Sequence, residues 1–329
     1  MSFIDKDIML YNAKQIAEGK LIPEMVDYFV TNGIKTFQKA NNLVVDGKAG
    51  PVTIAKYLEL KHTADTMGTS MSNPALPLIR RGIGYYPTGK GIYIRDLSTG
   101  GKPEELVKLC KDLGFKFVVI GSVWQDRTLG IKHTKRFNTK EELETYGNAF
   151  RNAGIEVWVW GYPYPKREEE FINFLIADAL FAGAVGVILD PEIPYRKKAL
   201  QATVLMQMLK SELDNFHLAL GVTSYGSVKY FKDFPYEEFA RFPGTFGSPQ
   251  VYDKDNNLPS THALESFNGY KAAGFKEIVM SGPTFNKTPF QLKKLLFTYP
   301  TGTRGVIFWD LANLKANKKL YIVIKDYNL

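Results

Sequence analysis

Short apolar runs alternate with longer amphipathic segments from residue 91 to the end of the chain. Apolar runs rich in β-branched and aromatic residues are typical of buried strands, and apolar positions at helical spacing are typical of helices that cover a sheet. The predicted strands are residues 91–97, 116–124, 155–165, 185–192, 217–225, 246–253, 277–285 and 305–313. The predicted helices between them are residues 103–115, 140–154, 169–184, 198–213, 228–239, 261–274 and 289–299.

Strands that alternate with helices pair in parallel, because each helix carries the chain back to the same end of the sheet. Eight predicted strands over this length indicate an α/β fold of the (β/α)8 barrel type rather than an open sheet. No G-x-G-x-x-G sequence follows the first predicted strand, which weakens the alternative of a nucleotide-binding sheet.

The first sixty residues have a different pattern, in which segments 20–31, 33–43 and 51–60 predict three short helices. Asp46-Gly47 and Gly50 supply turn residues, and Pro51 suits the first turn of a helix. The following residues are rich in Ser, Thr, Gly, Pro and Asn and have no periodicity, which is typical of a linker. The predicted parts are a helical domain (1–60), a linker with the loop that leads into the barrel (61–90), and the barrel (91–329).

The string FQKANNLVVDGKAGPVTIAKYL in the first part resembles the small three-helix peptidoglycan-binding domain. The matching positions, in order, are Phe37, Gln38, Leu43, Asp46, Gly47, Gly50, Thr53 and Leu58. We expect Phe37, Leu43 and Leu58 to be core residues and the glycines to shape the loop. The resemblance implies that a groove beside the Asp46-Gly47 turn binds peptidoglycan.

Two carboxylates, Asp190 and Glu192, stand two residues apart where the apolar run GVIL ends. Residues i and i+2 of a strand point to the same side, with their backbones roughly 6 to 7 Å apart. Carboxyl pairs at such distances cleave glycosidic bonds, one as the acid and the other as base, nucleophile or stabiliser. A surface acid pair that closes a strand is the alternative interpretation.

The chemistry of a (β/α)8 barrel lies at the carboxyl ends of its strands. The predicted strand ends hold three acids among aromatic and amide side chains: Asp96, Ser122, Trp124, Tyr162, Tyr164, Asp190, Glu192, Thr223, Tyr225, Gln250, Tyr252, Trp309 and Asp310. Aromatic faces stack on sugar rings and carboxylates bind hydroxyl groups, so this set predicts a carbohydrate cleft. For each tyrosine, packing is an equally good interpretation, and Trp158 and Trp160 are expected to pack in the barrel or at the interface with the helices.

These motifs resemble glycoside hydrolase family 25, the muramidases that cut peptidoglycan. The chain matches the family in Asp96-Leu97-Ser98, Asp190-Pro191-Glu192, Tyr162, Tyr225, Gln250-Val251-Tyr252 and Asp310. It departs from the family at Thr99-Gly100-Gly101, where an aromatic residue or glutamine usually follows, and at Ser122, where a charged residue is frequent.

The resemblance implies a role for each of these residues. Glu192 is the general acid, Asp190 stabilises the oxocarbenium charge or orients a substrate N-acetyl group, and Asp96 assists. The implied substrate-binding residues are Tyr162, Tyr225, Gln250, Tyr252, Trp124, Trp309 and Asp310. A salt bridge or a loop cap is the alternative role for Asp96.

Composition narrows the possible partners. The charge of +8, from 42 basic and 34 acidic side chains, favours polyanions such as anionic wall polymers, and no nucleic-acid-binding signature accompanies it. Four scattered histidines and the single Cys110 argue against zinc and cysteine peptidases and against any disulfide within the chain. We expect no metal and no cofactor, no membrane span, and a monomer.

The sequence therefore predicts a peptidoglycan hydrolase that cleaves the β-1,4 bond between N-acetylmuramic acid and N-acetylglucosamine. Because the first residues lack a signal-peptide run, we expect synthesis in the host cytoplasm and action on the periplasmic wall after release, as in a bacteriophage endolysin. A virion-associated lysin is the close alternative. A glucosaminidase, an amidase or peptidase, and a non-catalytic wall-binding or virion structural protein with a degenerate barrel are the others.

Overall fold

The computed structural model describes residues 11, 12, 14, 15, 20, 21, 25, 33–66, 81–125, 134–252 and 261–328. The chain divides into two compact units, Met1–Leu78 and Ile79–Leu329. Each unit is described by itself.

The described part of the first unit contains two helices, α3 (Ile34–Ala40) and α4 (Pro51–Thr66). The predicted helix at 20–31 lies largely outside the described residues. Gln38 is buried and organises the loop between the helices. Its Nε2 donates to Asp46 Oδ1 and to Thr53 Oγ1, at 2.8 and 3.1 Å, and its Oε1 accepts from Gly47 N at 2.9 Å. Asn12 adds two further bonds, from its Nδ2 to Gly47 O at 2.9 Å and from Ala49 N to its Oδ1 at 2.7 Å, so two amide side chains hold the loop.

Two expectations for this unit need correction. Leu58 is 45% exposed, and the core position is taken by Tyr57, which is 5% exposed and faces Phe37 at 6.2 Å between ring centroids. The period of α4 therefore places Tyr57, and not its neighbour, toward α3. The helix also continues to Thr66, within the segment predicted as linker.

The second unit is a closed barrel of eight parallel strands. The strands are β1 (Gly89–Ile94), β2 (Phe115–Gln125), β4 (Glu156–Tyr162), β5 (Gly186–Leu189), β6 (Ala219–Tyr225), β7 (Phe246–Gln250), β8 (Val279–Pro283) and β9 (Gly305–Trp309). Pairing of β1 with both β2 and β9 closes the barrel. All eight predicted strands and the (β/α)8 fold are confirmed. One short strand, β3 (Thr134–Arg136), was not predicted, and it pairs antiparallel with the end of β2.

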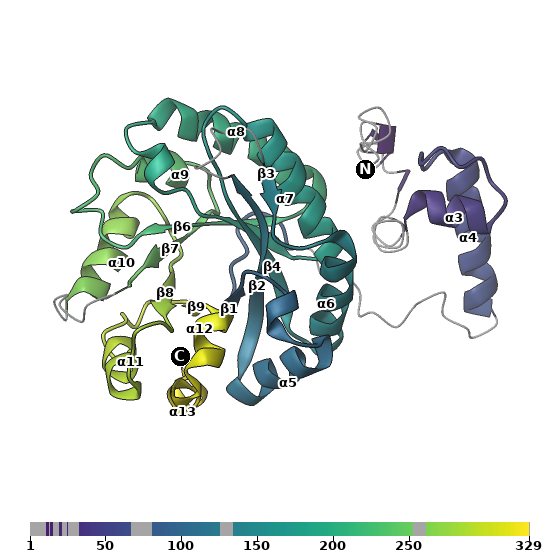
Figure 1. Cartoon of the computed structure of the whole chain (residues 1–329). Helices are drawn as coiled ribbons and strands as arrows, with labels where there is room; N and C mark the ends of the chain where they lie inside the picture. Colours follow the sequence, from purple (N-terminus) through teal and green to yellow (C-terminus); the bar gives the residue numbers. More distant parts are fainter. Residues whose placement is uncertain are drawn as a thin grey trace. The chain divides into compact units, whose positions relative to one another are not determined.

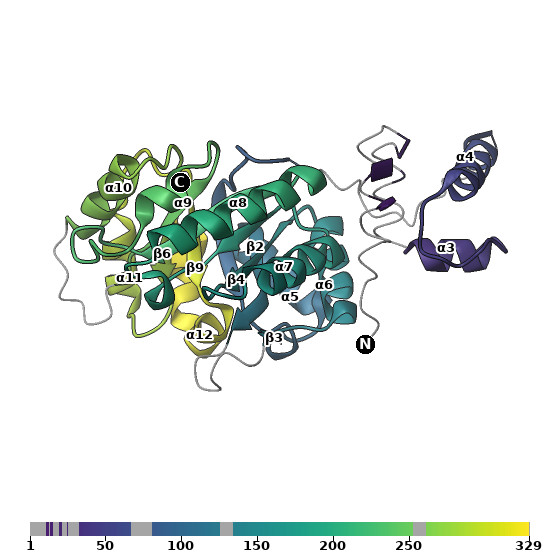
Figure 2. The same cartoon turned by 90° about the horizontal axis from the view of Figure 1, so that it is seen from above.

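Helices surround the barrel, as Figures 1 and 2 show. They are α5 (Pro103–Leu113), α6 (Lys140–Asn152), α7 (Glu168–Ala182), α8 (Ala199–Phe216), α9 (Tyr236–Ala240), α10 (His262–Ala272), α11 (Pro289–Leu296), α12 (Leu311–Ala316) and α13 (Tyr321–Asp326). Short 3-10 turns are η1 (Ser98–Gly100), η2 (Ile193–Tyr195) and η3 (Lys318–Leu320). The predicted helix 228–239 is shortened to α9, and α12 and α13 were not predicted.

Local sequence explains where several of these helices begin. The α6 helix starts with a reciprocal cap in which Thr139 Oγ1 accepts from Glu142 N and Glu142 Oε2 accepts from Thr139 N. Thr288 and Gln291 repeat this arrangement at α11. Such caps satisfy amide groups that have no partner inside the helix.

Buried side chains pack together inside the barrel. The inner cluster includes Tyr93, Trp158 and Trp160, all nearly inaccessible, so the expected packing role of both tryptophans is confirmed. Inward-facing glycines make room for the large rings: a Cβ on Gly221 would lie 2.2 Å from the ring of Phe246. A larger second cluster fills the space between strands and helices.

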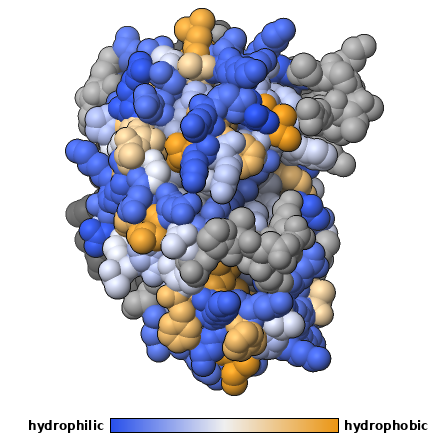
Figure 3. Space-filling model, turned by 90° about the vertical axis from the view of Figure 1, so that its left-hand side faces the viewer, coloured by the Kyte–Doolittle hydropathy of each residue, from blue (hydrophilic) through white to orange (hydrophobic). Residues whose placement is uncertain are grey.

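The surface of the barrel unit is mostly hydrophilic on the face drawn in Figure 3, with apolar residues dispersed among polar ones. Scattered exposed apolar residues are normal for a folded domain. Among the described residues, no helix has the length and apolar character needed to cross a membrane.

Candidate active site

Asp190 and Glu192 directly follow β5 at the carboxyl end of the barrel. The backbone of this segment is held on both sides. Asp190 N donates to Gly161 O at 2.9 Å, and Ser224 Oγ donates to Pro191 O at 2.6 Å. Neighbouring strands β4 and β6 therefore fix the peptide that joins the two acids.

The carboxylate of Asp190 lies inside the barrel mouth and is only 7% exposed. Gln250 at the end of β7 donates from Nε2 to Asp190 Oδ1 at 2.8 Å. Burial and the nearby charge of Glu192 raise the pKa of Asp190 well above its usual range, and the Gln250 hydrogen bond only partly opposes this. Two carboxyls that interact in this way share the cost of ionisation, so the pair retains a proton at a pH where isolated carboxyls have lost it.

Three tyrosines lie close to the acid pair. Burial first, and then the charges of Glu192 and Asp190, raise the pKa of Tyr162 and of Tyr225, the latter to about 12. Burial also raises the pKa of Tyr252, with contributions from both acids. The predicted residues Tyr162, Tyr225, Gln250 and Tyr252 are thus brought together around the pair.

The hydroxyl of Tyr225 is buried and makes no hydrogen bond with any residue that the structure describes. Its ring stacks on Phe231 at 3.9 Å between centroids, with the planes 8° apart. The loop that carries Phe231 is tied to the loop after β5 by Arg196, whose Nε donates to Asp233 Oδ1 at 2.8 Å. The Tyr225 ring is thus fixed near the acid pair, and its hydroxyl is unsatisfied within the described part of the chain.

Aromatic side chains continue around the mouth from β9 toward β2. Trp309 packs edge-on against Trp160 at 5.3 Å and lies 5.1 Å from Tyr93, between ring centroids. Tyr93 in turn lies near Asp190. Burial raises the pKa of Tyr93, and the charge of Asp190 raises it further. Trp309 is therefore placed at the wall of the mouth, partly exposed, as a sugar platform requires.

Two further predicted acids make local hydrogen bonds. Asp310 is 3% exposed and caps α12, since its Oδ1 accepts from Asn313 N and Nδ2 at 3.0 and 2.7 Å. Asp96 Oδ1 accepts from Ser98 N and Ser98 Oγ at 2.9 and 2.6 Å. Its charge helps to raise the pKa of Tyr146 on α6, after burial and the nearby glutamates. Both acids thus hold chain turns at the rim.

Sequence reasoning missed two residues that shape the site. Ser224 is buried and positions the Pro191 carbonyl. Nothing in the sequence distinguishes Ser224 from other strand residues, and its role depends on the pairing of β6 with β5. Phe137 follows the unpredicted strand β3 and lies 5.4 Å from Trp160, between ring centroids. It stands in a segment where no strand was expected.

The structure thus combines a closed (β/α)8 barrel, a buried acid pair at the carboxyl ends of its strands, and a separate helical unit. Within the first unit, a family model described as "Putative peptidoglycan binding domain" matches residues 25–56. A stretch of 103 residues is 30% identical to an N-alpha-acetyltransferase of Sulfolobus acidocaldarius, and covers 30% of this chain and 61% of that protein. The chain therefore spans less than two thirds of that relative.

Two solved structures share the barrel. The C-terminal domain of a "putative chitinase" from Desulfitobacterium hafniense superposes with a TM-score of 0.56 at 11% identity, over 73% of this chain and 99% of that one. The spore cortex-lytic enzyme SleL of Bacillus cereus superposes with a TM-score of 0.54 at 10% identity, over 75% of each chain. At this identity the likeness establishes the fold, which is the barrel type found in glycoside hydrolases.

Proposed function

We propose that this chain is a peptidoglycan hydrolase whose barrel cleaves β-1,4 glycosidic bonds and whose first unit binds the cell wall. The observation that carries the proposal is the buried Asp190 beside the more exposed Glu192, ringed by tyrosines and Gln250 at the barrel mouth. Support comes from the peptidoglycan-binding family model and from the fold shared with a chitinase and a cortex-lytic enzyme.

The proposed reaction begins with the proton that the acid pair retains. Glu192 delivers it to the glycosidic oxygen, and the bond from that oxygen to the anomeric carbon breaks. Both sugars of peptidoglycan carry a 2-acetamido group, whose carbonyl oxygen is able to add to the anomeric carbon. Asp190 then accepts a hydrogen bond from the acetamido N–H, while the Tyr225 hydroxyl donates to the acetamido oxygen. Glu192, now ionised, takes a proton from a water molecule that attacks the anomeric carbon, and the bond between that carbon and the acetamido oxygen breaks.

We place the cut between N-acetylmuramic acid and N-acetylglucosamine, as in the family 25 muramidases that the motifs resemble. The second candidate is the other β-1,4 bond, which a glucosaminidase cuts. The shared fold with a chitinase favours it, because chitin is a polymer of N-acetylglucosamine. We extend the proposal to a role as an endolysin that acts on the periplasmic wall after release from the cytoplasm.

The experiment is a digest of purified peptidoglycan by the wild type and by Glu192→Gln, followed by borohydride reduction and mass spectrometry. We expect reduced muramic acid ends from the wild type only, with wall binding retained by both proteins. Glu237→Gln on the exposed side of α9 is the matched control and should digest like the wild type. Reduced glucosamine ends would move the cut to the other bond. Binding without any product would contradict the enzyme and favour a wall-binding protein.

A further inference from the structure

Two aromatic rings at the β2–β3 rim extend the wall of the active site. Trp124 at the end of β2 and Phe137 just after β3 lie 6.4 Å apart between ring centroids, with the planes 8° from parallel. Phe137 contacts Trp160, which contacts Trp309. Both Trp124 and Phe137 are partly exposed, unlike Trp160, which is 4% exposed. The rim aromatics are therefore continuous with the site and still accessible.

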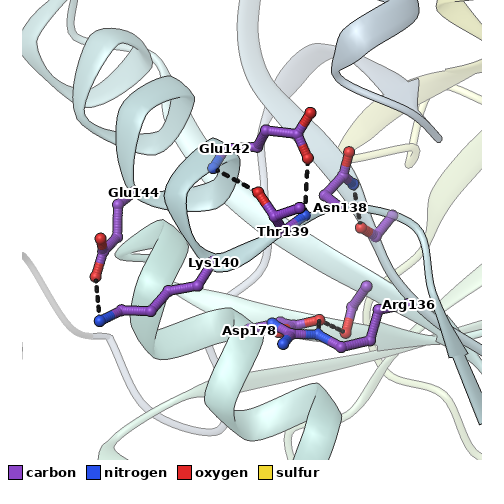
Figure 4. Close-up of polar contacts among 9 residues, drawn as sticks. Arg136, Asn138, Thr139, Lys140, Glu142, Glu144 and Asp178 are labelled. Carbon is purple, nitrogen blue, oxygen red and sulfur yellow. Dashed lines mark hydrogen bonds and ion pairs between the residues drawn. The ribbon is translucent and has the colours of Figure 1, made fainter. Parts of the chain in front are cut away.

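The strand before Phe137 is anchored to the barrel. Arg136 forms an ion pair with Asp178 on α7, and Asp178 also accepts from Ser122 Oγ at 2.8 Å (Figure 4). The carboxylate of Asp178 is completely buried. Phe137 N itself donates to Ser122 O at 2.9 Å. These contacts hold β3 against β2 and α7 and limit the movement of the Phe137 backbone.

The residue after Phe137 is anchored as well. Asn138 is buried, and its Nδ2 donates to Gly121 O at 2.6 Å and to Arg95 O at 3.3 Å. Its Oδ1 accepts from Leu97 N at 2.8 Å. This amide joins the segment after β1 to Gly121 within β2, and Thr139 then caps α6 (Figure 4). Consecutive residues on both sides of Phe137 are thus fixed by ion pair, hydrogen bond or helix cap.

We propose that Trp124 and Phe137 form a glycan-binding platform, which adds a sugar subsite on the β2–β3 rim beyond the sugars at the acid pair. This rests on the proposed function. The apolar C–H face of a pyranose packs on an aromatic ring, and a ring fixed before binding loses little conformational entropy on contact. Ring contacts lead from this rim through Trp160 to Trp309, at the wall of the mouth that holds the acid pair. Asn138 and Arg136 are positioning residues, because they act through Phe137.

The test compares two substitutions at Phe137 in the full-length Glu192→Gln protein, which does not consume ligand. Phe137→Leu keeps an apolar side chain against Trp160 and lacks a flat face, whereas Phe137→Tyr keeps the face. Affinity is measured by calorimetry for a disaccharide and an octasaccharide of the peptidoglycan glycan strand. We expect Phe137→Leu to weaken octasaccharide binding about tenfold and to leave disaccharide binding unchanged, with Phe137→Tyr close to the parent.

Phe290→Leu is the matched control, since Phe290 on α11 is 75% exposed and should not affect either ligand. Trp124→Leu is the second variant and should give the same length-dependent loss even where Phe137→Leu folds poorly, which thermal unfolding reports. Unchanged octasaccharide affinity in both variants, in an enzyme whose wild type digests glycan, would overturn the subsite alone. Absence of glycan hydrolysis by the wild type would remove the proposed function and the subsite with it.

Discussion

Asp190 and Asp310 occupy equivalent places after two barrel strands, yet their carboxylates meet different partners. Each directly follows its strand and is nearly inaccessible, at 7% and 3% exposure. Asp310 accepts two hydrogen bonds from Asn313 and caps α12. Asp190 accepts from Gln250 and lies near a second carboxylate, Glu192. One acid therefore stabilises a helix end, and the other interacts with a second acid.

A position at the end of a strand does not by itself identify a catalytic acid. The carboxyl ends of barrel strands are also where connecting helices begin, and helix starts need acceptors for free amide groups. The partner decides between the two roles. An acid whose oxygen faces backbone and side-chain N–H groups of the next turn is a cap, and a buried acid that lies near another acid is a candidate for chemistry.

The largest difference in activity is expected when the charge of each acid is removed by substitution with the isosteric amide. We expect Asp190→Asn to lower kcat for peptidoglycan hydrolysis by on the order of 10³, because the pair can no longer share a proton or accept from the substrate. Asp310→Asn keeps an acceptor for Asn313 and should retain near wild-type activity and thermal stability. Steady-state kinetics and thermal unfolding check both. Equal losses of activity in the two variants would contradict the distinction between cap and catalytic acid.

A smaller effect should follow from removing single hydroxyls. The hydroxyls of Tyr225 and Tyr195 are both buried and make no hydrogen bond within the described part of the chain. Removal of a hydroxyl that makes no hydrogen bond leaves no other group without a partner. Tyr225→Phe and Tyr195→Phe should therefore both have the free energy of unfolding of the wild type. Only Tyr225→Phe should lower kcat, by on the order of 10², because only its hydroxyl is placed to stabilise the reacting acetamido oxygen. Denaturant unfolding and kcat separate the two, and unchanged kcat in Tyr225→Phe would remove the phenol from the mechanism.

The barrel could be predicted from the sequence because its strands are short apolar runs separated by long amphipathic helices. The acid pair was predicted from i, i+2 spacing at a strand end, although β5 ends at Leu189 and both acids lie in the segment that follows it. The cap role of Asp310 was readable too, because Asp is a preferred residue directly before the first turn of a helix. It was missed because the strand prediction was extended to residue 313.

Other features depend on neighbours that are distant in sequence. Ser224 supports Pro191 only because β6 pairs beside β5. Phe137 reaches Trp160 because β3 folds back onto the end of β2 and because Asn138 joins the segment after β1 to Gly121 within β2. A three-residue strand and a lone amide carry no periodic signal, so pattern analysis does not find them. Leu58 and Tyr57 differ by one position on a helix, which is within the error of assigning its buried face.

The smallest expected effect is a shift in the pH dependence of activity. The surroundings of Asp190 predict the direction of this shift. Burial and Glu192 raise the pKa of Asp190, and the hydrogen bond from Gln250 opposes the rise by stabilising the ionised form. In Gln250→Leu the donor is absent, so the pair should keep its proton to a higher pH. The alkaline limb of kcat/KM should therefore move to higher pH, even where the amplitude of the profile falls. Asp190→Asn should lose this response to residue 250. An alkaline limb that stays in place, with an acid limb that moves to higher pH in Gln250→Leu, would mean that the ionised form of the pair, rather than the protonated one, is needed for the cut.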